Sequence, residues 1–251
     1  MRLFLTGALM GAFFVLVSPA FAGDRHVDLM AKASPAVGAL YKMEDDGDMS
    51  FLCSVTAIGR DDKATVLLTA FHCVTKGVSY RVTFDGKTYL AARVWKIPGY
   101  EVDDKKYRRA YHEPEVDMAM FLVDGADVPI MDLADAAHME PGREIVTVGF
   151  PLGVAKVHYA GSVAGVFDRP GSNEDGYQLL QTFGAPGSSG SSIINVETGK
   201  IVSVLVAARQ QRVGLPVIFA TPIEYRRFLQ EVPTGKEKQV GGSKPSDESS
   251  Q

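Results

Sequence analysis

Most of the chain consists of short apolar or β-branched segments separated by turn residues. This pattern predicts strands, and strands at such spacing favour barrels or sandwiches over an α/β fold. Asp85-Gly86 lies between two of the segments and predicts a two-residue hairpin turn, because both turn positions need positive φ. The expected strands are 37–43, 51–59, 64–70, 78–84, 87–95, 117–123, 144–150, 157–166, 177–182, 191–195, 201–206 and 217–220.

The remaining segments predict connectors and ends. The charged stretch 98–116 is interpreted as a solvated insertion, although it could also shape a cleft. Thr221 as N-cap and Pro222 at the first helical position predict a short helix to about residue 231. The Gly, Ser, Lys and acid content of residues 234–251 predicts a disordered tail. The expected domains are a 23–233 unit with barrels at about 33–125 and 143–233 and a connector at 126–142.

The N-terminus has the pattern of an export signal. Arg2 precedes the apolar stretch 3–17, and Ala20-Phe21-Ala22 fits a cleavage site after Ala22. An uncleaved anchor is the alternative, but the apolar stretch is short compared with the roughly 20 residues usual for a membrane span. We therefore expect a signal peptide at 1–22 and a periplasmic or secreted mature protein without stable membrane association.

Charge and cysteine content narrow the function classes. A net charge of −4 gives no reason to expect nucleic-acid binding. Cys53 and Cys73 are the two cysteines of the chain. In an exported protein they favour one disulfide, worth on the order of 3 kcal/mol, over a buried reduced pair. The five histidines are scattered, without zinc-site spacing, so we expect neither a metal nor another cofactor.

Two distant motifs together indicate nucleophilic catalysis. His72 follows an apolar run in Leu67-Leu68-Thr69-Ala70-Phe71-His72-Cys73, and Ser189 lies in Gly187-Ser188-Ser189-Gly190-Ser191. Either motif alone is common. A serine attacks an amide when a histidine takes its proton and a carboxylate orients that histidine. His72 is thus the candidate base and Ser189 the candidate nucleophile.

Asp117 is the favoured orienting acid. It precedes the apolar run Met118-Ala119-Met120-Phe121-Leu122, where a carboxylate needs a hydrogen-bonding partner. Asp103, Asp104 and Glu115 compete, but they belong to the charged stretch. In the serine loop, Gly187 and Gly190 permit a tight turn, which predicts that the N–H groups of Gly187 and Ser189 form the oxyanion hole.

These motifs resemble those of the chymotrypsin-like serine proteases, which share the order His, Asp, Ser. Their T-A-A-H-C motif matches Thr69-Ala70-Phe71-His72-Cys73 except at Phe71, and G-D-S-G-G or the G-N-S-G-G of the HtrA-type branch matches at Gly187, Ser189 and Gly190. The likeness covers residues 33–231. It implies an all-β fold of two six-stranded antiparallel barrels with a short C-terminal helix and a site between the barrels.

Two departures from the family pattern affect the serine loop. Ser188 replaces the acid that pairs with a newly cut N-terminus in the digestive enzymes, so that activation switch is not expected. Ser191 replaces the second glycine, as in the glutamate-specific bacterial relatives. No PDZ-like segment follows, so the oligomeric quality-control role of HtrA-type enzymes is not carried over, and we expect a monomer.

The resemblance also suggests the specificity pocket. By family position Phe183 lies at its base, with a wall formed by Val204, Leu205, Val206 and the following alanine. Without an acid or base there, we expect cleavage after a small or medium apolar residue; Phe183 as ordinary core is the alternative. The predicted function is an exported serine endopeptidase acting on proteins or peptides. A catalytically weak homologue that binds peptides and a hydrolase of another fold are the competing hypotheses.

Overall fold

The computed structural model describes residues 22–60, 63–75, 78–85, 88–96, 100–102, 107–109, 117–134, 139–167, 177–209 and 217–222. The expected signal peptide and the 234–251 tail therefore lie outside the described residues. No helix among the described residues is long and apolar enough to cross a membrane.

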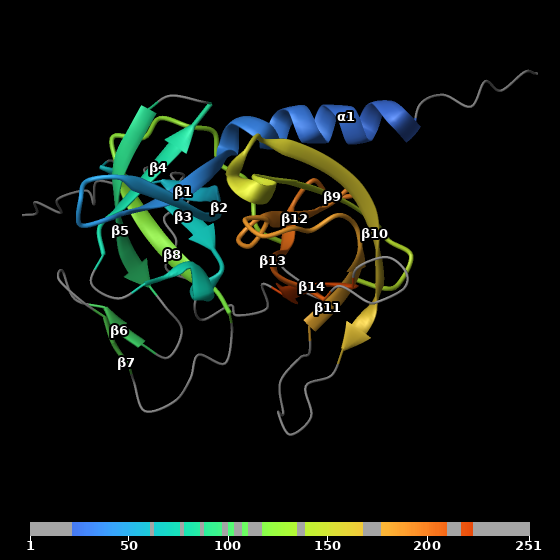
Figure 1. Ribbon diagram of the computed structural model, residues 1–251. Coiled ribbons are helices and arrows are strands. Elements are labelled where there is room, and N and C mark those ends of the chain that lie inside the picture. The colour runs from blue at the N-terminus through green and yellow to red at the C-terminus, as the bar shows by residue number, and fades with distance from the viewer. Residues whose placement is uncertain are drawn as a thin grey trace, which may run out of the picture.

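Two closed antiparallel barrels lie side by side (Figure 1), which confirms the predicted fold class. The first barrel has the order β1-β2-β3-β8-β5-β4 and the second the order β10-β11-β14-β13-β12-β9. The strands of the first are β1 (Val37–Met43), β2 (Met49–Arg60), β3 (Ala64–Thr69), β4 (Tyr80–Phe84), β5 (Thr88–Lys96) and β8 (Ala119–Asp124). Those of the second are β9 (Glu144–Gly149), β10 (Val157–Phe167), β11 (Tyr177–Gln181), β12 (Ser192–Asn195), β13 (Ile201–Arg209) and β14 (Val217–Pro222).

Smaller elements complete the structure. Within the charged stretch, β6 (Tyr100–Val102) and β7 (Tyr107–Arg109) form a two-stranded sheet. The 3-10 turns are η1 (Ser34–Ala36), η2 (Phe71–Cys73) and η3 (Pro151–Gly153).

The barrels share a core, and this explains the continuous apolar runs in two strands. In β3, Val66 and Leu68 pack into a cluster that also contains Val146 and Ile194 of the second barrel. Leu67 points the other way, into the interior of the first barrel. Because successive side chains of a strand face opposite sides, both sides of β3 are buried and all six of its residues are buried. β8 alternates in the same manner.

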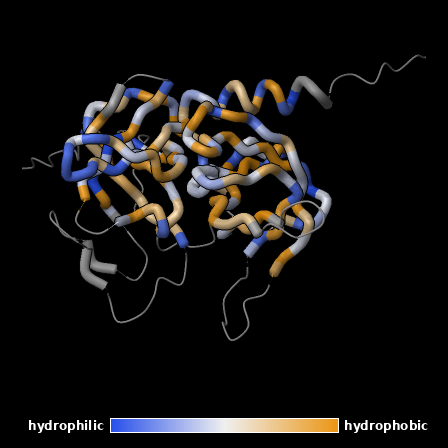
Figure 2. Tube along the Cα trace, viewed as in Figure 1, coloured by the Kyte–Doolittle hydropathy of each residue, from blue (hydrophilic) through white to orange (hydrophobic). Residues whose placement is uncertain are grey.

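Figure 2 shows the hydrophobic residues concentrated in the strands, whereas the turn joining β1 and β2 is hydrophilic. That turn contains Gly47 at φ +90, a conformation that glycine adopts readily. The hairpin of β4 and β5 differs from the sequence prediction. Phe84 pairs with Thr88, so three residues, not two, separate β4 from β5.

The sequence analysis did not predict α1 (Ala22–Ala33), the helix that runs across the second barrel in Figure 1. Leu29 and Ala33 are buried and Met30 packs beside them in the core shared by the barrels. Arg25 donates to the carbonyl of Glu197. At the other end of the chain, Thr221 and Pro222 belong to β14, so no helix begins at Pro222 as predicted; residues 223–231 lie outside the described residues.

Candidate active site

His72 lies in a tight turn at the end of a buried strand. β3 ends at Thr69, Ala70 is extended and fully buried, and η2 carries the histidine out of the core. The imidazole side chain is 44 % exposed. The strand therefore ends at the rim of the first barrel and presents a solvent-accessible imidazole.

Asp117 holds His72 by both of its oxygens. The pairing of Thr69 with Ala119 brings the end of β3 beside the start of β8, so residues just beyond each end meet. Asp117 Oδ2 lies 2.8 Å from His72 Nδ1, and Oδ1 accepts the His72 backbone N–H at 2.9 Å. The structure thus brings these two predicted residues together. Asp103, Asp104 and Glu115 lie outside the described residues.

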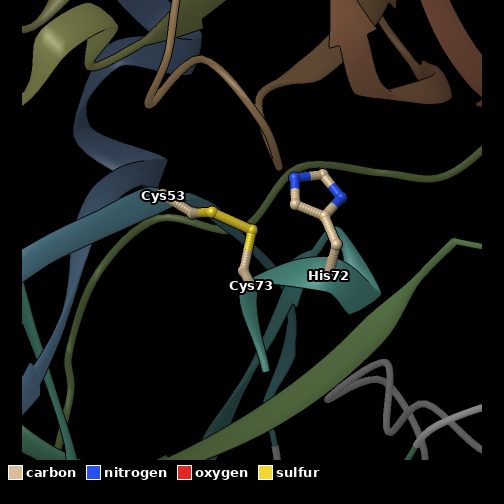
Figure 3. A group of neighbouring side chains, drawn as sticks. All are labelled: Cys53, His72 and Cys73. Atoms are coloured by element: carbon tan, nitrogen blue, oxygen red, sulfur yellow. A yellow bond between two sulfur atoms is a disulfide. The ribbon is translucent and has the colours of Figure 1, made fainter. Parts of the chain in front are cut away.

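Cys53 and Cys73 form a disulfide beside the imidazole (Figure 3), as the sequence suggested. Cys53 belongs to β2, and Cys73 follows His72 directly. One ligand atom of each of these three residues lies within 4.8 Å of the others. Because both sulfurs are in a disulfide, they are not thiolates available to a metal ion. The bond instead ties the turn that carries His72 to β2.

The serine loop consists of two consecutive tight turns. The Ser188 N–H donates to the Ala185 carbonyl at 2.9 Å, and the Ser191 N–H donates to the Ser188 carbonyl at 3.0 Å. The third positions of these turns are Gly187 at φ +90 and Gly190 at φ +84. Type II turns require such a positive φ, and proline is common at their second position, where Pro186 stands in the first turn. Ser189 lies half-buried between the two glycines.

Two backbone N–H groups of this loop remain available. Among the described residues, the N–H groups of Gly187 and Ser189 donate no backbone hydrogen bond. The peptides that contain them are nevertheless fixed, because Pro186 O accepts from Leu152 N–H at 2.6 Å and Ser188 O accepts from Ser191 N–H. In a trans peptide the N–H points opposite to the carbonyl, so both donors have set directions. Two such fixed donors can stabilise a developing negative charge.

The structure accommodates both serines that depart from the family pattern, Ser188 and Ser191, in the interior of the loop. Ser188 is buried, and its hydroxyl accepts a hydrogen bond from the Ala185 N–H at 3.2 Å. The residue at the position of the family's acid is therefore bonded within the loop. Ser191 is also buried and occupies the space beside Gly149. A Cβ on Gly149 would lie 1.9 Å from Ser191 Oγ.

The residues predicted to form the specificity pocket do not all face a common space. Phe183 is 44 % exposed and stacks on Tyr159 of β10, with ring centroids 4.6 Å apart. Burial raises the pKa of the Tyr159 phenol. The side chains of Val204, Leu205 and Val206 are buried in hydrophobic clusters, so β13 presents its backbone there, followed by the exposed Ala207 and Ala208.

The place of Ile218 beside the predicted specificity pocket was not predicted from the sequence. A Cβ on Gly184 would lie 2.7 Å from Ile218 Cδ1 and 3.6 Å from Ala208 Cβ. Ile218 of β14 is fully buried, lies against Gly184 and pairs with Ala208 of β13. These residues are far apart along the chain, and no local pattern marks them.

Two antiparallel barrels, a His–Asp pair on one and a serine loop on the other form the arrangement of chymotrypsin-like proteins. The trypsin-like peptidase domain matches residues 53–204 of this chain, which is more than half of its length. The chain therefore belongs to the trypsin-like peptidase family.

Relatives of the chain are HtrA- and DegP-type proteins. A putative serine protease HhoB of Synechocystis sp. is 24 % identical over 66 % of this chain and 36 % of its own length. A probable periplasmic serine endoprotease DegP-like of Pseudomonas fluorescens is 29 % identical over 45 % of this chain and 24 % of its own length. The chain thus spans about a third or less of these curated relatives.

A solved structure shares the fold. The HtrA-type protease AlgW with a tripeptide superposes with a TM-score of 0.62 at 20 % identity, covering 82 % of this chain and 61 % of that one.

Proposed function

We propose that this protein is a serine endopeptidase with His72 as general base, Asp117 as its orienting carboxylate and Ser189 as nucleophile. His72 takes the Ser189 hydroxyl proton while Oγ attacks the scissile carbonyl. The tetrahedral oxyanion is bound by the Gly187 and Ser189 N–H groups, and protonated His72 gives its proton to the leaving amine. A water, activated by His72 in the same way, then hydrolyses the acyl-enzyme.

One observation carries this proposal: Asp117 accepts two hydrogen bonds from His72, with 2.8 Å from Nδ1 to Oδ2 and 2.9 Å from the backbone nitrogen to Oδ1. The Nδ1 contact leaves Nε2 as the nitrogen that can accept a proton, which a general base requires. A histidine with a purely structural role has no need for a carboxylate that fixes both its ring and its backbone.

The oxyanion hole is supported by the two N–H groups of the serine loop that have fixed directions and no backbone acceptor among the described residues. Such preorganised donors are worth about 10²–10³ in kcat each in serine proteases. We therefore propose that this loop is competent without ordering by substrate.

The preferred residue before the scissile bond is proposed to be small or medium and apolar. By family position its pocket lies between the 183–185 segment and β13. Ile218 lies against Gly184 and pairs with Ala208 across the β13–β14 ladder, which limits the depth available to a substrate side chain. This favours alanine or valine over a large side chain.

Export and a monomeric state complete the proposal. The predicted signal peptide at 1–22 supports export, and several relatives are described as periplasmic endoproteases. Release from a bacterial cell into the periplasm or medium, followed by size-exclusion chromatography, tests both points.

The deciding experiment is labelling of the purified mature protein with a fluorophosphonate probe, alongside Ser189→Ala and His72→Ala. The expected result is labelling of the wild type and loss of labelling in both variants. A folded, disulfide-bonded wild type that does not react would contradict the proposal and favour the peptide-binding homologue.

A further inference from the structure

Ser54 of β2 is a fully buried polar residue at the contact between the two barrels. Its backbone N–H donates to the Ser189 carbonyl at 2.9 Å, and its own carbonyl accepts from Thr69 Oγ1 at 2.7 Å. Its neighbour Cys53 is disulfide-bonded to Cys73. Ser54 therefore links the strand that leads to His72 with the loop that carries Ser189.

The side chain of Ser54 makes two further hydrogen bonds. Oγ–H donates to the Gly187 carbonyl at 3.0 Å, and Oγ accepts the Phe150 N–H at 2.9 Å. A serine hydroxyl can donate one hydrogen bond and accept others, so both contacts are satisfied by one group. The hydroxyl thus connects the serine loop with the segment that follows β9.

Both contacts act on peptides that set the direction of the proposed oxyanion donors. The Gly187 carbonyl belongs to the peptide that lies between the two donor N–H groups. Phe150 leads into η3, where the Leu152 N–H holds the Pro186 carbonyl and so fixes the Gly187 N–H. The orientation of the two peptide groups on either side of Gly187 therefore depends on the buried Ser54 hydroxyl.

The surroundings leave little freedom for another arrangement. A Cβ on Gly190 would lie 2.1 Å from the Ser54 carbonyl oxygen, and a Cβ on Gly149 would lie 3.0 Å from Ser54 Oγ. The distance at Gly190 is too short for any side chain and requires glycine, and the contact at Gly149 is tight. The serine loop and the end of β9 are packed directly on Ser54.

We propose that Ser54 is a positioning residue for the oxyanion hole: its hydroxyl holds the Gly187 carbonyl and the Phe150 N–H so that the Gly187 and Ser189 amides converge. This inference rests on the proposed endopeptidase function. Ser54 does not touch the reacting atoms, and it acts only through the backbone of the serine loop.

The test compares Ser54→Ala with Thr56→Val. Ser54→Ala removes the two side-chain bonds and keeps both backbone bonds. Thr56 lies on the same strand, equally buried, and its hydroxyl has no partner among the described residues, so Thr56→Val is the matched control. The concentration of active enzyme in each preparation is determined by active-site titration, so that misfolded protein does not lower the apparent kcat.

The expected result for Ser54→Ala is a fall in kcat of roughly tenfold or more with KM within about twofold, because an oxyanion contact acts on the transition state. Affinity for a peptide boronate should fall by a similar factor, while affinity for the product peptide stays the same. Equal kcat values in Ser54→Ala and Thr56→Val would overturn the inference while leaving the endopeptidase proposal intact.

Amide hydrogen exchange provides a measurement that does not depend on activity. The Phe150 N–H should be protected in the wild type and in Thr56→Val, and should exchange roughly tenfold faster in Ser54→Ala. A Phe150 amide that exchanges freely in the wild type would overturn the inference, even if Ser54→Ala fails to fold. Failure of the wild type to react with fluorophosphonate, by contrast, would overturn the endopeptidase proposal itself.

Discussion

Asp117 fixes His72 at two points, with Oδ2 2.8 Å from Nδ1 and Oδ1 2.9 Å from the backbone nitrogen. The first contact selects the tautomer of the ring, and the second holds the η2 turn from which the ring projects. The carboxylate is partly exposed, with 24 % of its side chain accessible, whereas Met118 after it is fully buried. The acid is thus anchored by the strand that follows it.

Asp117→Asn is expected to lower kcat by about 10⁴-fold, the effect of the same change in trypsin. The amide is nearly isosteric and can still accept the His72 N–H. However, its NH₂ group placed opposite Nδ1 favours the wrong tautomer, in which Nε2 carries the proton. Steady-state kinetics on a peptide substrate measure the effect.

The matched control is Asp124→Asn, at the other end of β8. Asp124 is exposed and pairs with Arg93 at the surface, where an ion pair is worth about 0–1 kcal/mol. It should leave kcat unchanged. A similar kcat in both variants would remove Asp117 from the proposed mechanism.

Gly190→Ala should destabilise the protein by about 2–5 kcal/mol and abolish labelling of Ser189. Gly190 has φ +84, and an added Cβ would lie 2.1 Å from the Ser54 carbonyl oxygen and 2.2 Å from Thr69 Oγ1. The cost combines a left-handed backbone with overpacking against Thr69 Oγ1 and the Ser54 main chain, which cannot swing away.

Gly142→Ala separates these two contributions. Gly142 has φ +88 but no atom within 4 Å of an added Cβ, so only the backbone cost of about 1–2 kcal/mol applies. Urea denaturation of both variants gives the comparison. Equal losses of stability would mean that the packing of Gly190 on Ser54 contributes nothing.

The sequence predicted the strands well because each barrel strand has a local signature. β1 begins and ends at the predicted residues, and β3 and β8 have buried runs that follow from their place between two cores. Local motifs and chain order also singled out His72, Asp117 and the Cys53–Cys73 pair, and the structure brings these residues together. Their geometry supports that assignment.

Features that depend on distant residues escaped the sequence analysis. Ser54 has the appearance of an ordinary serine in a strand, and only the folded structure places Gly187 and Phe150 beside it. Pro222 has the signature of a helix start, yet it pairs with Ser203 at the end of β14. In that case strand pairing overrides the local preference.

The α1 helix differs from these features, because its sequence does contain a helical pattern that the prediction did not use. His26, Leu29, Met30 and Ala33 follow the spacing of one helical face, and three of these side chains pack into the shared core. No element was predicted from the sequence for residues 23–32, so this pattern went unused.

Removal of the disulfide, by reduction or in Cys53→Ala/Cys73→Ala, should lower stability by about 3 kcal/mol, because the bond closes a loop with a sequence separation of 20. For a protein of this size that corresponds to a fall in Tm of roughly 6–12 °C. Thermal melts with and without reductant measure it. The double variant should not respond to reductant. An unchanged Tm in wild type whose thiols are shown to be free by mass spectrometry would contradict the prediction.

Ile218→Ala tests the proposed depth of the specificity pocket. Ile218 Cδ1 lies against Gly184, and Ile218 pairs with Ala208 of β13, so truncation should open room for a longer substrate side chain. The ratio of kcat/KM for leucine or methionine over alanine before the scissile bond should rise by about tenfold or more, since one methylene of pocket space is worth roughly 10–200-fold. A peptide library with that position varied measures the ratio.

The control is Ile193→Ala, which makes the same truncation at another fully buried isoleucine of the same core cluster. Both variants should lose about 2–5 kcal/mol of stability because each leaves a cavity. Only Ile218→Ala should change specificity, because Ile193 lies on β12 and is not among the atoms nearest to Gly184. A shift of equal size in both variants would mean that a loosened barrel, not pocket depth, determines which side chains are accepted.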